Sequence, residues 1–386
     1  MMTCACIVLY TYITVYLCHL VPFLFQVCKL KQQLREGYER IIPTTSHQHH
    51  TSSSSFSPPS TPSQTSHNKP AQHTMPSQKP VALVVGASRG IGRQVAIDLA
   101  KNGYAVVVAA KSITDPSKLP SKTPDPKSPA STVTTVAREI ASAGGEATPV
   151  QVDVRSEESV NALVAKTIAK YNRLDVVVYN SGAIWWASVA DTPLKRFQLM
   201  QRVNPEGLYA VVQAALPHLR KAPQGGRLVV VSPPIYSRFF RGKAAYAVGK
   251  VGMSVLTKGL AMDFEREGRT DMAITSIWPA VAIESAATEQ FTKLNPSEAA
   301  DLRKPTIFSD AILAILRAPA ARVNGQLLLD EDFLRDECGV ADFAKYSVVP
   351  GSKPRRIMPR RLPDLTVDEQ DDEGKRVDSA AARSKL

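Results

Sequence analysis

The sequence holds a tyrosine and a lysine, Tyr246 and Lys250, that stand four residues apart in the segment AAYAVGKVGMSVLTKGLAMDFE. The segment is expected to form one long helix, and this spacing places both side chains on the same helical face. A neighbouring ammonium group lowers the pKa of a tyrosine, which makes the phenol usable as a proton donor or acceptor. The pair therefore indicates acid–base chemistry, although the same spacing also occurs on ordinary helix surfaces.

A second group of residues could bind phosphate. The run GASRGIG consists of Gly86, Ala87, Ser88, Arg89, Gly90, Ile91 and Gly92. Glycines at a turn between a strand and a helix let the backbone approach a pyrophosphate without an intervening Cβ atom. The helix that begins near Gly90 offers free N–H groups and a positive dipole end to the phosphates. Because an apolar run precedes the glycines and an amphipathic helical pattern follows them, the run predicts a dinucleotide site.

The end of the second predicted strand indicates which dinucleotide is bound. Proteins that bind NAD usually carry an acidic residue there, whereas this sequence reads VVVAAKS, with Lys111 in that place. An ammonium group attracts the 2′-phosphate that a carboxylate would repel, and Arg89 can add a second positive charge. NADP is therefore predicted in preference to NAD. Asp153, at the end of the third strand, is expected to accept a hydrogen bond from the adenine amino group.

The elements that must position these residues lie between 78 and 345. Short β-branched runs alternate there with helical patterns, and a last strand, GQLLLD, completes the series. Near-continuous apolar strands separated by helices indicate an α/β domain with a doubly wound parallel sheet, a Rossmann fold. The proline-rich residues 112–130 can continue neither a helix nor a strand, so they are expected to form a surface loop.

The amino-terminal residues allow two interpretations. Within residues 1–28, the apolar run 5–28 is about long enough to cross a bilayer, and the lysines that follow it would leave the rest of the chain in the cytosol. Residues 29–77 form a low-complexity linker that can bury little apolar surface. Met75 stands directly before the first strand, so a mis-assigned start is the alternative to a membrane anchor. Both interpretations stay open.

The carboxy-terminal residues 346–386 are predicted to form a tail. It ends in Ser-Lys-Leu, the tripeptide that the peroxisomal import receptor binds at a free carboxy terminus. A peroxisomal location is therefore expected, with a membrane-anchored protein facing the cytosol as the alternative.

The composition excludes several other classes of protein. The formal net charge is +12, but the basic residues are scattered and form no long stripe with aromatic residues, so nucleic-acid binding is not expected. Four of the five cysteines lie within the first 28 residues, which excludes a disulfide framework for the folded part. No metal site is predicted.

These motifs together resemble the short-chain dehydrogenase/reductase family over about residues 80–330. The matching features are GASRGIG, Asp153 in DVR, the NSGA that begins at Asn180, Asn204 in VNPEG, and YAVGK. Within the family, AAKS after the second strand and Ser-Pro-Pro after the fifth are most similar to the hydroxysteroid dehydrogenase-like group that is allied to peroxisomes. The resemblance implies a homo-oligomer and places Asn180 and Lys250 in the cofactor site.

The resemblance also implies a catalytic tetrad of Asn204, Ser232, Tyr246 and Lys250. The tyrosine would transfer the proton, the serine would hold the carbonyl oxygen, and the asparagine would order a water that relays protons through the lysine. Counting back from Tyr246, however, the usual serine position falls nearer Pro233. Ser232 is expected to reach the site only through a one-residue bulge in the loop that follows it.

The predicted activity is the NADP(H)-dependent interconversion of a ketone or aldehyde with an alcohol on a small lipophilic substrate. The related animal group carries a sterol-carrier-like domain that is not expected in this chain. A lipid would therefore be held by the reductase pocket, under the segment that follows Pro279. Trp185 and Trp186 would line this pocket, or one of them would serve packing or a dimer contact. The alternative, which Ser-Pro-Pro supports, is a non-catalytic NADP(H)-binding sensor or scaffold.

Overall fold

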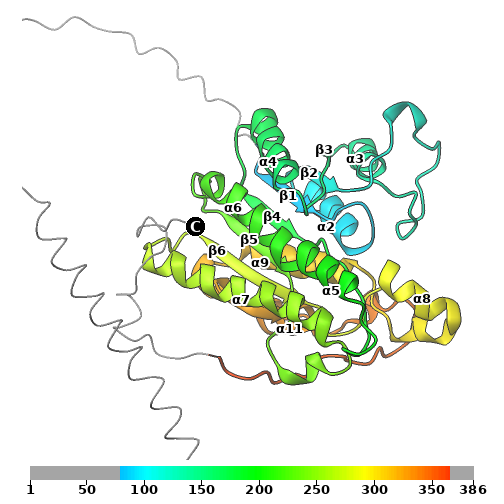
Figure 1. Ribbon diagram of the computed structural model, residues 1–386. Coiled ribbons are helices and arrows are strands. Elements are labelled where there is room, and N and C mark those ends of the chain that lie inside the picture. The colour runs from blue at the N-terminus through cyan, green and yellow to red at the C-terminus, as the bar shows by residue number, and fades with distance from the viewer. Residues whose placement is uncertain (1–78, 366–386) are drawn as a thin grey trace, which may run out of the picture. The chain divides into compact units, whose positions relative to one another are not determined.

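A seven-stranded, wholly parallel sheet forms the centre of the computed structural model, which describes residues 79–365 (Figure 1). The strands are β1 (Val81–Val85), β2 (Ala105–Ala110), β3 (Glu146–Gln151), β4 (Val176–Tyr179), β5 (Arg227–Val231), β6 (Ala273–Trp278) and β7 (Leu327–Leu329). Their order across the sheet is β3-β2-β1-β4-β5-β6-β7. The strand order reverses between β1 and β4, and ligands of such sheets bind beyond the carboxyl ends of the strands at this reversal. The predicted doubly wound sheet is confirmed.

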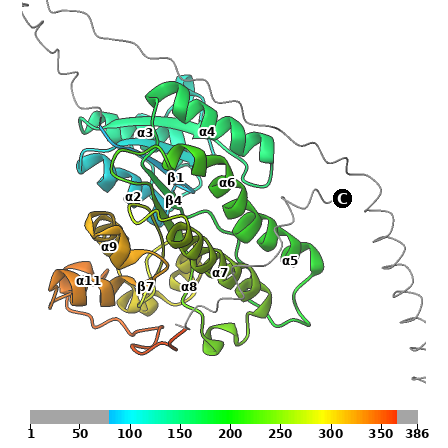
Figure 2. The same cartoon turned by 90° about the vertical axis from the view of Figure 1, so that its left-hand side faces the viewer.

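Helices connect the strands and cover both faces of the sheet. They are α2 (Gly90–Lys101), α3 (Val133–Ser142), α4 (Glu157–Tyr171), α5 (Leu194–Gln201), α6 (Gly207–Leu219), α7 (Ala244–Arg266), α8 (Ala286–Leu294), α9 (Thr306–Arg317), α10 (Ala320–Val323) and α11 (Asp330–Cys338). Figure 2 shows α2, α9 and α11 on one side of the sheet and α4, α6 and α7 on the other. The helix expected to carry Tyr246 is α7.

Two apolar layers hold the helices on the sheet, and strand alternation decides which residue enters which layer. In β1, Ala82 and Val84 pack with α2 and α9, whereas Val81, Leu83 and Val85 pack with α6 and α7. All five of these side chains are buried. Since successive residues of a strand point to opposite faces, an unbroken apolar run is what a strand covered on both faces requires.

The fold extends past the predicted boundary at residue 345. Arg356 forms an antiparallel bridge with Val281, and Met358 is buried. Leu362 still packs against a buried apolar cluster. Residues 346–362 are therefore part of the domain rather than the start of a tail, because they supply apolar side chains to it.

No helix within residues 79–365 is long and apolar enough to span a membrane. The predicted apolar span at 5–28, the linker at 29–77 and the terminal Ser-Lys-Leu lie outside these residues.

Candidate active site

The turn between β1 and α2 is shaped by glycines that leave no room for a side chain. Gly86 has a φ of +87°, and a Cβ atom added to it would lie 2.6 Å from the backbone nitrogen of Ser181. A Cβ atom on Gly92 would lie 2.2 Å from the carbonyl oxygen of Gly86. The Asn180 side chain braces the turn, since its Nδ2 donates to the same oxygen at 3.0 Å. The residues therefore fit a pyrophosphate cradle, in which the backbone itself must approach the ligand.

The amino-terminal end of α2 suits an anion. No acidic residue stands in its first turn, and the Arg89 side chain before it is exposed and caps no backbone group. Ala87 and Ser88 are buried beneath the turn, and Ile91 is half-buried. A dinucleotide phosphate would thus meet backbone N–H groups and the positive end of the helix dipole.

The loop of residues 112–130 folds back over this turn, which the sequence did not reveal. The carbonyl oxygen of Pro126 accepts the N–H of Gly90 at 3.0 Å, and Ser131 Oγ donates to the carbonyl oxygen of Ser88 at 2.6 Å. Lys127 Nζ lies 2.9 Å from Glu284 Oε1, a residue just before α8. The loop therefore joins the glycine turn to the segment that follows β6.

Two cations gather at the ends of β2 and β3. Lys111 Nζ lies 3.1 Å from Asp153 Oδ2, and Arg155 Nε donates to Asp153 Oδ1 at 2.8 Å. The hydrogen bonds from Arg155, with a further one from Lys111, hold the pKa of the Asp153 carboxyl well below its usual range. Asp153, the residue expected to meet the adenine amino group, is thus paired with two cations in this structure. Arg155, which follows Asp153 by two positions in the sequence, adds a positive charge that sequence reasoning missed.

Lys250 and Asn204 converge beside Gly182, and Tyr246 lies about one helical turn before Lys250 on α7. Tyr246 and Lys250 are both buried on α7, and Lys250 Nζ donates to the carbonyl oxygen of Val231 at 2.8 Å. A Cβ atom on Gly182 would lie 3.5 Å from both Lys250 Nζ and Asn204 Oδ1, which is ordinary contact distance, so both side chains lie against this glycine. The structure thus brings three members of the predicted tetrad to the carboxyl end of the sheet.

Asn204 lies in a π-helical stretch, Arg202–Glu206, between α5 and α6. Its side chain is completely buried and is held by both backbone groups of Ala183: Oδ1 accepts the N–H at 2.9 Å, and Nδ2 donates to the carbonyl oxygen at 3.1 Å. Pro205 removes one backbone donor from the helix at this point. Wide helical turns of this kind occur frequently at functional sites.

Burial sets the protonation of the buried pair. It raises the pKa of Tyr246 above its ordinary value and lowers the pKa of Lys250 to about 7. Each shift has the same cause, because removal from water penalises the charged form of either side chain. Burial therefore acts on the tyrosine pKa in the direction opposite to the effect of a neighbouring ammonium that the spacing predicts. The phenol keeps its proton, and the lysine titrates near neutrality.

Ser232 does not join the other three residues. It is completely buried, and its Oγ lies 2.9 Å from Ser276 Oγ on β6 and 2.9 Å from Ser254 Oγ on α7. Ser254 stands eight residues after Tyr246, about 12 Å further along the helix axis. The prediction that Ser232 holds the substrate oxygen is therefore wrong. Its hydroxyl belongs to a hydrogen-bonded cluster of three serines inside the domain.

Aromatic side chains surround the tyrosine. The Trp186 ring meets Tyr246 edge-on with centroids 6.2 Å apart and stacks on Phe291 of α8 at 5.8 Å. Phe239, from the short helix Ser237–Phe240, also lies 6.2 Å from Tyr246, and Trp278 packs against it. We call Trp186, Phe239, Trp278 and Phe291 the aromatic wall. It gives the site an apolar side that a lipophilic molecule could contact.

Trp185 and Trp186 have different surroundings. Trp186 is 43% exposed and belongs to the aromatic wall. Trp185 is half-buried, and the Arg196 guanidinium lies over its ring, 4.7 Å from the centroid. Trp186 therefore faces the tyrosine, whereas Trp185 packs against α5.

A doubly wound parallel sheet with a glycine cradle after β1 is typical of dinucleotide-binding domains. Residues 80–295 match the family described as short chain dehydrogenase, and the chain belongs to this family. Membership of this family supports a dehydrogenase or reductase activity with a nicotinamide cofactor.

Relatives and solved structures agree with this assignment. The chain is 36% identical to hydroxysteroid dehydrogenase-like protein 2 of Danio rerio over 75% of its own length, and 35% identical to the Mus musculus protein over 75%. It covers 64% and 54% of these two proteins, so it spans less than two thirds of their length.

Among solved structures, a putative dehydrogenase from Xanthomonas campestris has a TM-score of 0.62 at 35% identity, with 75% of this chain and 98% of that one covered. A single-substitution variant of the actinorhodin polyketide ketoreductase, solved with NADPH, has a TM-score of 0.53 at 25% identity, with 66% and 97% covered.

Proposed function

We propose that this chain interconverts a ketone or aldehyde with an alcohol in an NADP(H)-dependent reaction, and that Tyr246 transfers the proton. The observation that carries the proposal is the buried pair of Tyr246 and Lys250, with the lysine beside Gly182 at the sheet edge where the glycine cradle lies. The bound nicotinamide cofactor would supply or accept the hydride.

The residues of the site divide the remaining work. Because burial raises the pKa of Tyr246, its phenol holds the proton that a carbonyl oxygen needs on reduction. Lys250, whose pKa lies at about 7, can both hold and release a proton near neutral pH. Asn204, fixed by Ala183, keeps the π-helical turn in place beside the lysine.

The preference for NADP rests on charge. Lys111 and Arg155 share the single carboxylate of Asp153, so this corner of the site carries an excess positive charge. No carboxylate stands at the end of β2 to receive ribose hydroxyls in the manner of NAD-binding proteins. An extra phosphate on the cofactor would be attracted there.

The aromatic wall supports a lipophilic substrate. Trp186 and Phe291, at 43% and 41% exposure, present apolar surface beside the buried tyrosine. When an apolar molecule covers aromatic surface of this kind, its removal from water contributes favourable binding free energy. The substrate class proposed is a small carbonyl or alcohol with an apolar body.

The test is the full-length Tyr246→Phe variant beside wild type. We expect NADPH affinity within about twofold of wild type, because the phenol is not part of the glycine cradle. NADPH oxidation with medium-chain and steroidal ketones should fall by about 100-fold or more. Tyr209→Phe, which alters an exposed tyrosine of α6, is the matched control.

A non-catalytic NADP(H)-binding sensor remains the second candidate, because the Ser232 hydroxyl is buried away from Tyr246. NADPH binding without turnover on any carbonyl, in wild type and Tyr246→Phe alike, would favour the sensor. Binding of neither NADPH nor NADH would contradict both candidates.

We also propose that the chain forms a homo-oligomer through α7. Val248, Val255 and Met262 are exposed at 57%, 56% and 43%, and they recur every seven residues along that helix. Residues at this spacing form one apolar stripe. Val255→Asp should lower the mass measured by analytical ultracentrifugation to that of the monomer, and an unchanged mass would contradict the proposal.

The location in peroxisomes stays a proposal based on the terminal Ser-Lys-Leu and its import receptor. A fluorescent protein fused to the amino terminus of the full chain should co-localise with peroxisomes, and deletion of residues 384–386 should disperse it. Retention on carbonate-washed membranes after that deletion would instead favour the membrane-anchored alternative.

A further inference from the structure

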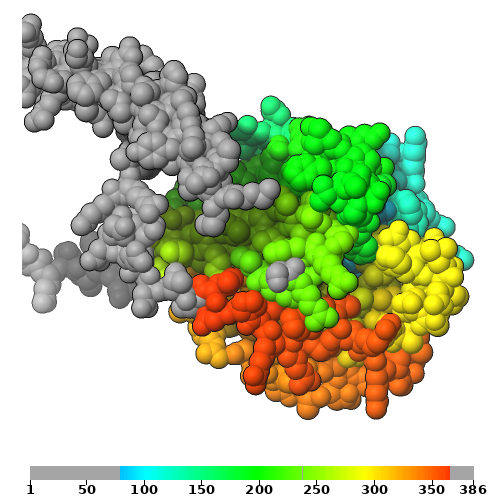
Figure 3. All heavy atoms as spheres, turned by 60° about the horizontal axis from the view of Figure 1, so that its bottom comes forward, coloured from blue at the N-terminus to red at the C-terminus, as the bar shows by residue number. Residues whose placement is uncertain are grey.

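The carboxy-terminal residues 355–362, which we call the strap, return to the sheet edge where Tyr246 lies. The backbone N–H groups of Ile357 and Met358 donate to the carbonyl oxygen of Ala280 at 2.8 and 3.2 Å. Arg356 also forms its bridge with Val281. Ala280 and Val281 come directly after the end of β6, so the strap lies along the segment under which a substrate is expected. Figure 3 shows this orange-red part of the chain on the surface, against the lime-green residues before α7.

Met358 is the strap residue that packs in the same buried cluster as Tyr246. Its side chain is only 4% exposed and belongs to the same packed cluster as Tyr246, Phe239 and Ala280. The phenol of Tyr236 donates to its Sδ at 3.6 Å. Leu362 packs against this cluster as well. The apolar surroundings of the tyrosine are therefore completed by residues about 110 positions further along the chain.

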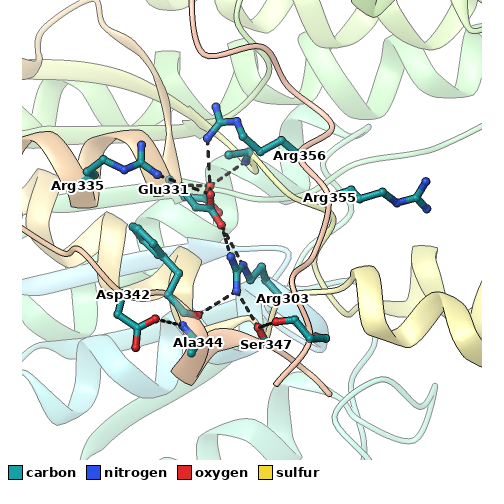
Figure 4. A network of polar contacts seen from close by, with 12 residues as sticks. Arg303, Glu331, Arg335, Asp342, Ala344, Ser347, Arg355 and Arg356 are labelled. Carbon is teal, nitrogen blue, oxygen red and sulfur yellow. Dashed lines mark hydrogen bonds and ion pairs between the residues drawn. The ribbon is translucent and has the colours of Figure 1, made fainter. Parts of the chain in front are cut away.

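The strap is fastened by a nearly buried ion-pair network at the start of α11. Arg356 Nη1 and Nη2 donate to the two carboxylate oxygens of Asp332 at 2.9 and 2.7 Å, and Arg356 Nη1 lies 3.6 Å from Glu331 Oε2. Glu331 is in turn paired with Arg303 at 2.9 Å. A bidentate arginine–carboxylate pair fixes direction as well as distance. Figure 4 shows Arg356 joining this network while the neighbouring Arg355 points away from it.

Arg355 provides an internal contrast. Its side chain is 77% exposed and pairs with Asp301 rather than with the acidic residues of α11. Two adjacent arginines therefore pair with different acidic residues, Arg355 at the exposed surface and Arg356 within the network at α11. Loss of Arg355 removes a surface ion pair, which is worth little. Loss of Arg356 removes a bidentate pair and leaves the strap held by its backbone hydrogen bonds to Ala280 and by apolar packing.

We propose that the strap is a wall of the substrate pocket, with Met358 as a specificity-determining residue and Arg356 as the residue that positions it. The inference rests on the proposed reductase function and extends it to the shape of the substrate. A thioether on an unbranched side chain adapts to apolar surfaces of different shape. The pocket should therefore accept ketones whose apolar body reaches past Tyr246 to the strap, such as long-chain or polycyclic ketones.

The test compares full-length Met358→Ala, Met358→Leu, Arg356→Ala and Arg355→Ala with wild type, using cyclohexanone, 2-decanone and a 3-ketosteroid. Met358→Ala should change the ratio of kcat/KM between the 3-ketosteroid and cyclohexanone by about tenfold or more, since it removes three heavy atoms and one methylene in an apolar pocket is already worth about tenfold. Met358→Leu, which conserves volume, should keep the ratio within about threefold. NADPH affinity should stay unchanged in all four variants.

Arg356→Ala should raise KM for the larger ketones by about tenfold with kcat within about threefold, while Arg355→Ala should leave both constants unchanged. Thermal unfolding of each variant separates loss of fold from loss of specificity. If Met358→Ala and Arg356→Ala lower the melting temperature but change kcat/KM by the same factor for all three ketones, the strap is only structural and the proposal is overturned.

A second readout keeps this result separate from the proposed reaction. Quenching of tryptophan fluorescence in the NADPH-loaded chain reports ketone binding without turnover, because Trp186 and Trp278 belong to the aromatic wall. If wild type turns over no ketone but Met358→Ala still reorders the three ketone affinities, the reductase assignment fails and the strap proposal stands. An unchanged order of affinities, or no ketone binding by wild type, overturns the strap proposal itself.

Discussion

The glycine turn and the surroundings of Tyr246 are assembled in different ways. The turn is formed by seven consecutive residues, Gly86–Gly92, and its fit depends on backbone atoms packed too closely for a Cβ atom. The surroundings of Tyr246 come from Trp186, Phe239 and Met358, which stand far apart in the sequence, and Phe291 stacks on Trp186. The first region is specified by the absence of side chains and the second by their volume. We therefore expect single substitutions to abolish binding in the first region and to change selectivity in the second.

The largest expected effect is that of Gly92→Ala. An added Cβ atom would lie 2.2 Å from the carbonyl oxygen of Gly86 and 2.5 Å from Asn180 Nδ2, and the Gly86 backbone is part of the turn itself. We expect NADPH affinity, measured by fluorescence titration, to fall by about 100-fold or more, about 3 kcal/mol.

Gly259→Ala is the matched control for that substitution. Gly259 lies within α7, has no atom within 4 Å of an added Cβ, and should gain up to about 1 kcal/mol in unfolding free energy. If Gly92→Ala bound NADPH as tightly as Gly259→Ala does, the cradle would not be limited by backbone space.

The next effect concerns the cation pair at the other end of the cofactor site. Lys111→Glu reverses the charge beside Asp153. We expect NADPH affinity to fall by about tenfold while NADH affinity changes by less than about twofold, because only the 2′-phosphate meets this charge. The same charge reversal at exposed Lys170, in the last turn of α4, controls for net charge. Equal losses for both dinucleotides would contradict the NADP assignment.

The buried lysine predicts a pH dependence of stability. The pKa of Lys250 falls from 10.5 to about 7 on burial. At a pH between these two pKa values, Lys250 carries a proton in the unfolded chain but not in the folded chain. The unfolding free energy should therefore rise with pH from 7 to 9, by at most about 1.4 kcal/mol per pH unit from this group.

Urea unfolding at pH 7, 8 and 9 measures this slope. Lys250→Met should remove it, whereas Lys258→Met on the same helix should retain it. A slope that is the same in wild type and Lys250→Met would show that the lysine is charged when folded.

The smallest effect on turnover is expected at Ser232. Ser232→Ala removes one hydroxyl from the cluster with Ser254 and Ser276, which should lower the unfolding free energy by about 1–3 kcal/mol. The turnover number should change by less than about threefold, whereas loss of a group that holds the substrate oxygen costs about 100-fold or more. A loss of that size in a folded variant would return Ser232 to the catalytic site.

Local patterns predicted the parts of the molecule that depend on neighbouring residues. The β-branched runs gave the strands, the glycine run gave the turn before α2, and the four-residue spacing of Tyr246 and Lys250 gave their common face. Each of these follows from the period or the backbone freedom of a short segment. Arg155 could have been found in the same way, because it stands two residues after Asp153 in DVR.

Other features depend on residues that come together only in the fold. The direction of the Tyr246 pKa shift follows from burial, which no spacing reveals. The orientation of Ser232 depends on its partners from α7 and β6. Met358 lies in a segment whose sequence has no strand or helix period. The position of this segment depends on the pairing of Arg356 with Asp332. For such positions the sequence supplies the residue types but not their partners.

The buried lysine also couples the binding of a proton to the binding of a cofactor. With a pKa of about 7, Lys250 is protonated in only about half of the molecules at neutral pH. A polyanion entering beside it favours the charged form, so binding and proton uptake are thermodynamically linked. The heat of dinucleotide binding would then depend on the ionisation enthalpy of the buffer, and the affinity would weaken as the solution becomes more alkaline.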